Sequence, residues 1–585
     1  MMSHEKKTLI FRILALLFYV IFIISCIVYL NRPELYVRPQ IYFISILSMI
    51  LIAFLEALIT FNDASWGRTL FFSIQIFLIA LSTTLTQIEL YPSITGVDTW
   101  THKTLVEFIV SSGHLPRGTY FLGGASVYLK MPSFHILLSS QILISDLSYK
   151  WTSFLSIGLV SFILEITGIY LIVLRIFHNH KQASLAIIFI AIADVIINMI
   201  GINIIPNTIG VAIVVMGLYL WIVYREKLLN NTRQVILFII LAFGLVFMHS
   251  LSYAFLIWQS LIIFMFLWAD KNTRKKRSIA TWITIIFILA LFEWGLVSQL
   301  YLRSSILILK NLFVYGINPS HNYGSKIYIP LKYALLSRMG MFMYFAFMGG
   351  GILIALLNGK NQRSFPLLVI VVLGIVFSML VLFTPVLSSI TGRYRYYTGV
   401  TGSIFAAFLL DKIWELKIRH AKIQKVTQIS EFFIVGVMAF LMILSPIANE
   451  DNPITGKYTS RTGLYTSEIS AAEFVIFKLP RSIPISSDSL YTADIIYMTS
   501  WVDKKTMPRK ATYPTSFEDV FCLKENPVFL LRKDLVKNRA FTLGKGSTAI
   551  RYPPLTPKEF QIIMSCVSSC ADITYNNEDV IIFKG

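Results

Sequence analysis

Charged residues are scarce in this sequence. Asp, Glu, Lys and Arg make up only 14% of its 585 residues, against about 25% in soluble domains. Mean hydropathy is correspondingly high, at +0.69, and 56% of the residues are hydrophobic. This composition excludes an ordinary soluble enzyme and indicates a polytopic membrane protein.

Cysteine is scarce too, with four residues in the chain. Cys26 falls in the first apolar segment, whereas Cys522, Cys566 and Cys570 lie near the C-terminus. Their spacing fits no metal site. The last three are either free thiols or include one disulfide from Cys522 to Cys566 or Cys570. A His-Glu-x-x-His motif is also missing, which argues against an intramembrane metalloprotease.

The apolar segments predict about thirteen membrane crossings, since each crossing needs ~20 residues. The alternate loops between them are basic, most strongly at residues 274–277 and 417–425. This bias predicts a cytoplasmic N-terminus and an extracytoplasmic C-terminus in a multi-pass protein of the cell membrane. Contact between the basic loops and anionic membrane lipid explains the net charge of +20, so we expect no nucleic-acid partner. The expected crossings are 9–30, 40–61, 69–88, 153–175, 183–200, 207–224, 235–249, 251–269, 279–301, 333–357, 365–386, 398–411 and 430–447.

Three regions follow from this pattern. Residues 1–68 form an N-terminal transmembrane hairpin. Residues 69–448 form a transmembrane domain whose large outer loop spans residues 89–150. Residues 449–585 are more polar and form an extracytoplasmic domain. The expected fold class is an all-α polytopic membrane protein of about 13 transmembrane helices, with a small C-terminal α/β domain.

The C-terminal region shows the patterns of a soluble domain. Two helix starts have the form of a capping box, Ser470 with Glu473 and Thr556 with Glu559. The chain ends in a predicted hairpin of residues 572–575 and 580–583.

The outer loop carries the most informative motif. A helix that starts at Val97 would place Asp98 and His102 on one face and would lie on the membrane surface. A carboxylate and an imidazole at this spacing can take a proton from a hydroxyl group or bind a divalent cation such as Mg²⁺ or Mn²⁺. Alternatively, Asp98 is a helix N-cap and His102 is a solvated surface residue.

Two further outer turns carry polar groups between apolar spans. Residues 247–252 contain His249, and residues 388–397 contain Arg393 and Arg395. Guanidinium groups bind phosphate oxygens in a bidentate way. These residues therefore either hold a lipid phosphate at headgroup depth, with His249 beside it, or contact bulk phospholipid.

Aromatic residues are the candidates for sugar contacts. Tyr120, Tyr128 and Trp151 offer flat faces on which sugar rings stack, although interfacial aromatics usually anchor a protein in the membrane. The residues expected to contact the substrate are Trp100, Tyr120, Tyr128, His135 and Tyr394.

The Gly-x-Asp-x-x-x-His pattern from Gly96 to His102, in a large outer loop of a chain with about a dozen spans and an outer C-terminal domain, resembles the GT-C membrane glycosyltransferases. These include archaeal oligosaccharyltransferases and polyprenyl-phosphate-sugar transferases. The resemblance covers roughly residues 69–447. It implies transfer of a sugar from a polyprenyl (dolichyl) phosphate or pyrophosphate carrier to an extracytoplasmic acceptor. Asp98 would be the base or metal ligand, next to His102, and Arg393 or Arg395 would contact the carrier phosphate.

The chain departs from the family pattern in two ways. The acidic loop follows the third span instead of the first, so residues 1–68 look like an added hairpin. The Trp-Trp-Asp-Tyr-Gly motif of oligosaccharyltransferases is absent, so transfer of oligosaccharide to Asn is not expected. The expected acceptor is a glycan or protein in surface glycan, glycolipid or glycoprotein assembly. The main alternative function is a transporter or flippase for a lipid-linked or small polar substrate, which would show ionisable residues near the midplane and an internal repeat.

Overall fold

The structure is a computed structural model. It describes residues 4–584 except 62–65, 117–127, 228–231, 270–275, 300–305, 307–309, 311–329, 359–363, 380–387, 416–420, 445–450, 460, 462, 481, 494, 496–510, 514–527 and 545–549.

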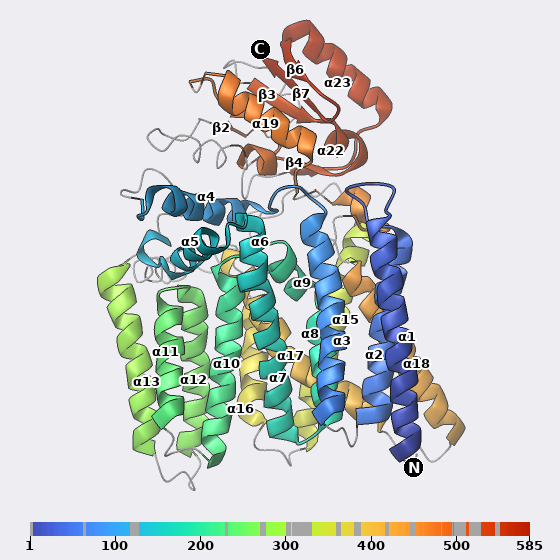
Figure 1. Ribbon diagram of the computed structural model, residues 1–585, viewed down its shortest axis with the longest axis vertical. Helices are drawn as coiled ribbons and strands as arrows, with labels where there is room; N and C mark the ends of the chain where they lie inside the picture. The colour runs from blue at the N-terminus through green and yellow to red at the C-terminus, as the bar shows by residue number, and fades with distance from the viewer. Residues whose placement is uncertain are drawn as a thin grey trace.

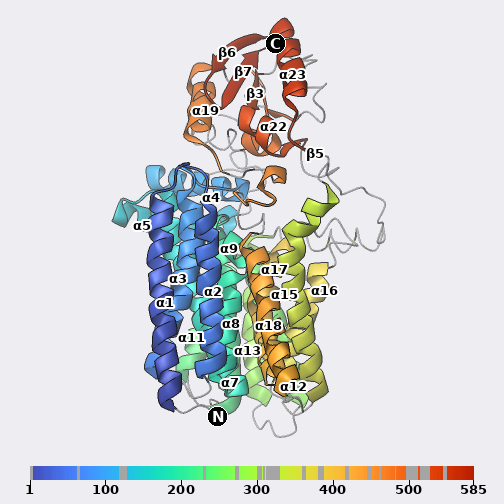
Figure 2. The ribbon, with the colours of Figure 1, turned by 90° about the vertical axis from the view of Figure 1, so that its right-hand side faces the viewer.

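The transmembrane domain is a bundle of long helices that stand side by side (Figures 1 and 2). Each expected crossing coincides with one of these helices or, for the fourth, fifth and ninth, with a helix continued by a short segment. Eight helices of the described residues are long and apolar enough to cross a membrane, and a ninth crossing is the pair α8 and α9, bent by 59°. The bundle helices are α1 (His4–Leu30), α2 (Gln40–Thr60), α3 (Trp66–Glu89), α7 (Leu159–Phe177), α8 (His180–Ile192), α9 (Asp194–Gly201), α10 (Pro206–Lys227), α11 (Thr232–Val246), α12 (Ser250–Ala269), α13 (Lys276–Leu291), α15 (Leu331–Asn358), α16 (Phe365–Met379), α17 (Ser388–Trp414) and α18 (Ala421–Ile443).

Small residues let the interior helices approach closely. A Cβ atom on Gly351 of α15 would lie 1.8 Å from the carbonyl oxygen of Phe405 in α17. One on Gly402 would lie 2.4 Å from the sulfur of Met348. Helix association in a membrane depends on such packing, because lipid tails are as apolar as the side chains.

The first turns of α17 correct one expectation. Residues 388–397 were expected to form a turn, but the helix already begins at Ser388. Tyr396 and Tyr397 on these turns are buried, and the Tyr396 hydroxyl donates to Glu165 of α7 at 2.5 Å. A helix satisfies its own backbone groups while these side chains find partners in the bundle, whereas a turn at this depth would leave backbone groups unpaired.

Three short helices cover the end of the bundle. Helices α4 (Val97–Ser112) and α5 (Ser133–Ser145) lie across the ends of α10 to α13, beneath the C-terminal domain (Figure 1). Helix α6 (Tyr149–Ser153) leads through a π-helical segment (Phe154–Gly158) into α7. The expected surface helix starting at Val97 is therefore present.

The C-terminal α/β domain lies at the end of the bundle opposite the N-terminus (Figures 1 and 2). Its main sheet has the strand order β2-β1-β3-β7-β6, with parallel pairs around β1 and antiparallel pairs on both sides of β7. The strands are β1 (Ile485–Ser486), β2 (Ala511–Thr512), β3 (Val528–Arg532), β6 (Asp572–Asn576) and β7 (Val580–Lys584), with a separate pair β4 (Phe541–Leu543) and β5 (Ile550–Tyr552). Helices α19 (Thr466–Lys478), α22 (Lys533–Asn538) and α23 (Pro557–Cys570) pack around these strands.

One of the two expected helix caps is confirmed. Thr556 and Glu559 form a capping box at the start of α23. The other is wrong, because α19 begins at Thr466 and its capping box joins Tyr465 to Glu468. Buried Arg461 binds Glu468, so this carboxylate fixes the start of the helix one turn before Ser470.

A buried ion pair ties the N-terminal hairpin to the C-terminal domain. Arg38, between α1 and α2, donates to both carboxylate oxygens of Asp451, at 2.5 and 2.8 Å. Its Nη1 donates to Thr86, and its Nη2, which also bonds Asp451, donates to Gln87 at the end of α3. The two ion-paired side chains are 1% and 0% exposed. One residue thus connects three regions of the chain.

Candidate functional site

Gly96 sets the start of the helix that carries the candidate acid–base residues. It is the N-cap of α4 and has a φ of +82°, a conformation that glycine adopts without strain. A Cβ atom here would lie 2.2 Å from the side-chain oxygen of Asn203. Gly96, and not Asp98, is therefore the N-cap, and the close approach of Asn203 fixes where α4 begins.

Asp98 faces Arg393 across the gap between α4 and α17. Its Oδ2 lies 4.0 Å from a guanidinium nitrogen of Arg393. The Asp98 side chain is 66% exposed and that of Arg393 is 29% exposed. The carboxylate is thus reachable from solvent while a cation lies beside it.

His102, four residues after Asp98, is buried instead of solvated. Its Nδ1 lies 2.9 Å from Nε2 of His135 in α5, and the two rings are 2% and 0% exposed. Burial lowers the pKa of His102 well below its ordinary value, and the neighbouring His135, Arg393 and His249 lower it further. Burial also lowers the pKa of His135 to about 3. Both imidazoles are therefore neutral at physiological pH, and one donates its proton to the other.

Tyr128 joins the histidine pair to the arginine. Its ring lies edge-on to His102, with the ring centres 4.6 Å apart, and its hydroxyl is hydrogen-bonded to Arg393. Burial raises the pKa of Tyr128, against the opposing charge of Arg393. The phenol stays protonated and fixes the guanidinium beside Asp98.

His249 lies in the short connection between α11 and α12. Its Nδ1 is 2.7 Å from the hydroxyl of Ser252, which in turn is hydrogen-bonded to Tyr397 of α17. Tyr397 also donates to Asn207 at 3.1 Å. Burial and then Arg393 lower the pKa of His249 to about 3. His249 thus belongs to the same cluster as His102 and Arg393, as a buried neutral ring.

Arg395 points to a different part of the site. It interacts electrostatically with Asp194, at the bend between α8 and α9, and with Arg338 of α15. Arg395 follows Arg393 by two residues, so the two side chains lie on nearly opposite faces of α17. The two guanidiniums that the sequence grouped together face different neighbours.

Two of the expected substrate contacts lie away from Asp98. Trp100 is 4% exposed and stacks under Lys103, whose Nζ is 4.5 Å from its ring centre. Tyr394 packs on Phe377, with ring centres 5.3 Å apart. Tyr120 lies outside the described residues.

Several residues of this cluster were not predicted from the sequence as site residues. Arg338, Asn207 and Tyr397 carry no motif, and each contacts the site only because its helix packs there. A polar residue near the end of a membrane helix could have drawn attention to Asn207 and Arg338, since such residues often line a functional path.

The residues offered for a divalent cation do not make a complete site. Among the described residues, no group of three or more His, Cys, Asp or Glu side chains is arranged to hold a metal ion. In the Asp98–His102 pair, Nδ1 of His102 is already committed to His135. We therefore derive no chemical step through a metal.

The remaining arrangement suits proton removal next to a developing negative charge. An exposed carboxylate can accept a proton from a bound hydroxyl group. An adjacent guanidinium held by Tyr128 can donate two parallel hydrogen bonds to phosphate oxygens.

Comparison with known proteins gives fold relatives. No protein-family model matches the chain, and no curated protein matches its sequence significantly. The archaeal oligosaccharyltransferase AglB from Archaeoglobus fulgidus, in complex with an inhibitory peptide and a dolichol-phosphate, is similar in structure with a TM-score of 0.52 and 13% identity. The match covers 80% of this chain and 70% of AglB. ArnT from Cupriavidus metallidurans matches with a TM-score of 0.45 and 11% identity over 88% of this chain and 97% of ArnT.

The AglB match extends over most of the bundle and supports the resemblance noted from the Gly96–His102 motif. The polytopic helical domain, the helices that lie across its end and the C-terminal α/β domain form one architecture. The chain therefore shares the fold of the archaeal oligosaccharyltransferase AglB.

Proposed function

We propose that this chain is an integral-membrane glycosyltransferase. It moves a sugar from a polyprenyl phosphate or pyrophosphate carrier to a hydroxyl group of an acceptor in surface glycan, glycolipid or glycoprotein assembly. The observation that carries the proposal is the approach of Asp98 to Arg393 at 4.0 Å, at the end of the bundle next to the C-terminal domain. The AglB structure, which shares the fold, holds a dolichol-phosphate.

The two residues divide the reaction between them. The carboxylate of Asp98 takes the proton of the acceptor hydroxyl, and the oxygen forms a bond to C1 of the donor sugar. The bond from C1 to the carrier phosphate breaks, and the phosphate leaves with the electron pair. Arg393 stabilises the charge that develops on the phosphate oxygens, and such fixed electrostatic contacts are usually the largest catalytic contribution.

A second pair of arginines, Arg395 and Arg338, favours the binding of a phosphate or pyrophosphate group. Arg395 and Arg338 repel each other, and Asp194 is the acidic group that opposes this repulsion. A phosphate or pyrophosphate group between α15 and α17 would remove the repulsion. Because a helix with its side chains is about 10–12 Å across, a phosphate bound beside Arg395 would occupy a position separate from the one beside Arg393.

The proposed location follows from the basic loops. The first turns of α1 and α3 lie together, since Arg68 donates to Thr8 at 3.1 Å. We place this end in the cytoplasm. The C-terminal domain and the Asp98–Arg393 site are then extracytoplasmic, where nucleotide sugars are absent and a lipid-linked donor is required.

Transfer of radiolabelled sugar from a polyprenyl-phosphate donor by the reconstituted full chain tests this function. Asp98→Asn keeps the shape of the side chain but removes its basicity, so turnover should fall about 100-fold or more while donor binding persists. Arg393→Lys keeps the charge but loses the planar fork, so donor affinity should weaken. Asp146→Asn, at the exposed end of α5, is the matched control and should retain activity. Full activity of Asp98→Asn would overturn the proposal.

A further inference from the structure

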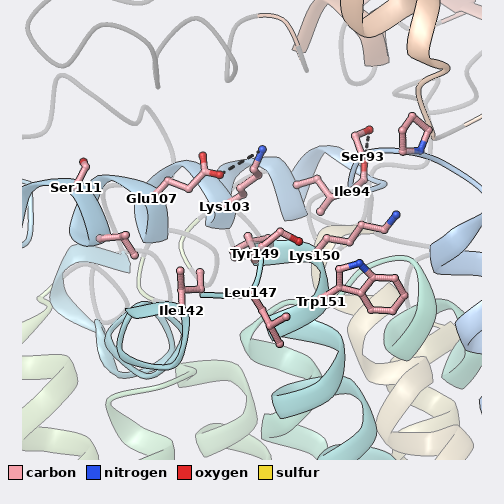
Figure 3. Close-up of a pocket in the computed structure, with 13 residues that line it drawn as sticks. Ser93, Ile94, Lys103, Glu107, Ser111, Ile142, Leu147, Tyr149, Lys150 and Trp151 are labelled. Carbon is pink, nitrogen blue, oxygen red and sulfur yellow. Dashed lines mark hydrogen bonds and ion pairs between the residues drawn. The ribbon is translucent and has the colours of Figure 1, made fainter. Parts of the chain in front are cut away.

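A second cavity lies on the far side of α4 from the Asp98–Arg393 site. It has a volume of about 460 Å³ and is enclosed by α4, the end of α5 and the start of α6 (Figure 3). The volume lies within the range of about 300–1,000 Å³ that is usual for small-molecule sites. Its lining includes Lys103, Glu107, Ile142, Tyr149 and Trp151. We call it the α4–α6 cavity.

The α4–α6 cavity is separate from the candidate active site. At 3.6 residues per turn, Glu107 lies on the opposite side of α4 from Asp98. A helix with its side chains is about 10–12 Å across. A group bound in the cavity is therefore outside bonding reach of Asp98.

The upper wall of the cavity is polar and carries both signs of charge. Lys103 Nζ lies 3.4 Å from Glu107 Oε1, and both side chains remain about one-quarter exposed. Tyr149 is 3% exposed, and no described residue is hydrogen-bonded to its hydroxyl. A buried hydroxyl without a partner costs free energy unless a ligand or water supplies one.

The lower wall is apolar and continues into the lipid-facing surface. Ile142 and Leu147 line the cavity, and Leu147 is 40% exposed. Beside them on α5, Leu143 and Ile144 are 64% and 85% exposed. Large apolar side chains exposed next to one another mark a surface that contacts lipid or another protein. Helix α5 packs against α6, which continues into the transmembrane helix α7 (Figure 1), so these side chains are expected at the membrane boundary.

We propose that the α4–α6 cavity binds the sugar headgroup of a membrane glycolipid. A sugar presents hydroxyl groups that donate to Glu107 and accept from Lys103, and its ring can lie against Trp151. Both lysines of the lining are already engaged, Lys103 with Glu107 and Lys150 with the carbonyl oxygen of Tyr91 at 2.6 Å, and the carboxylate of Glu107 would repel a phosphate headgroup. The apolar lower wall receives the upper part of the lipid chains, so the ligand is tethered in the membrane. This site goes beyond the transfer reaction, because it holds a glycolipid that does not react there.

Lipid binding to the detergent-solubilised full chain, measured by native mass spectrometry, tests the proposal. The probes are monoglucosyl dioleoylglycerol, dioleoyl phosphatidylglycerol and methyl glucoside. The monoglucosyl lipid should bind at one saturable site, at least tenfold more tightly than either of the other two. Equal affinity for phosphatidylglycerol would identify an anionic-lipid site instead. Equal affinity for methyl glucoside would show that the lipid chains do not contribute to binding. Either result, or the absence of saturable binding, would overturn the proposal.

Variants locate the binding. Ser111→Trp places a large ring in the cavity from an exposed position on α4, and Glu107→Gln removes the carboxylate. Each should weaken glycolipid binding at least tenfold, and unchanged binding in both would overturn the proposal. Asp146→Asn removes a nearby carboxylate outside the lining and should bind normally. Asp98→Asn should also bind normally, so failure of the transfer reaction and failure of this site are distinguishable.

Discussion

Oδ2 of Asp98 lies 4.0 Å from the guanidinium of Arg393, although one residue is on a helix that lies across the end of the bundle and the other is on a helix inside it. The pair exists only while α4 is held in position over α17. Residues that fix α4 therefore control the site without touching a substrate. This relationship leads to the first two predictions.

Gly96→Ala should disturb the site more than the same change at Gly113. Both glycines have positive φ values, +82° and +72°, so alanine is strained at either position by roughly 1–2 kcal/mol. Only at Gly96 does the added Cβ meet another atom, Asn203 Oδ1 at 2.2 Å, whereas Gly113 has open space. Gly96→Ala should lower both the melting temperature and the transfer rate, and Gly113→Ala should lower the melting temperature only slightly. Equal effects of the two changes would show that the contact with Asn203 does not hold α4.

The buried histidines should make the protein less stable in acid. The pKa values of His135 and His249 are about 3, and that of His102 is lowered well below 6.5, whereas the unfolded chain titrates near 6.5. Between pH ~3 and ~6.5 the unfolded state binds more protons, so the free energy of unfolding decreases as the pH falls through this window. The melting temperature in detergent should fall from pH 6.5 to 4.5. His135→Gln should show a shallower fall, and an unchanged slope would contradict the assignment.

Removal of one partner of the buried ion pair between Arg38 and Asp451 should destabilise the protein strongly. Both side chains are buried, so Asp451→Asn leaves the guanidinium without its counter-charge, at a cost of about 3–5 kcal/mol. Lys412→Gln breaks an exposed pair with Glu415 and should cost at most about 1 kcal/mol. Thermal unfolding of the purified proteins measures both. Similar small losses would mean that the N-terminal hairpin is not anchored through Arg38.

The proposed orientation can be measured by cysteine labelling in intact cells. With the four native cysteines replaced by serine, Glu578→Cys in the exposed turn of the C-terminal hairpin should react with a membrane-impermeant maleimide. Lys6→Cys at the exposed start of α1 should react only after the cells are opened. Reaction of Lys6→Cys in intact cells would reverse the topology and put the site in the cytoplasm.

Local features were predictable because local sequence determines them. An apolar stretch of about 20 residues has few alternatives to a transmembrane helix. A helix lies at each expected crossing, and eight of the described helices, or nine with the bent pair α8 and α9, are long and apolar enough to span a membrane. The start of α4 at Val97 and the terminal hairpin of β6 and β7 also follow from neighbouring residues. The turn expected at residues 388–397 was wrong because its residues find partners on α7 and α10, which are distant in the sequence.

The sequence by itself determined the membrane class, the crossings, the polar loop with Asp98 and the separate C-terminal domain, because hydropathy and short-range spacing specify them. Only the tertiary structure decided that His102 pairs with His135, that Arg393 joins Asp98 while Arg395 faces Arg338, and that Trp100 lies away from the site. These contacts depend on how α4, α5, α15 and α17 pack. Packing brings together residues that are far apart in the sequence, so their spacing along the chain does not predict which of them touch.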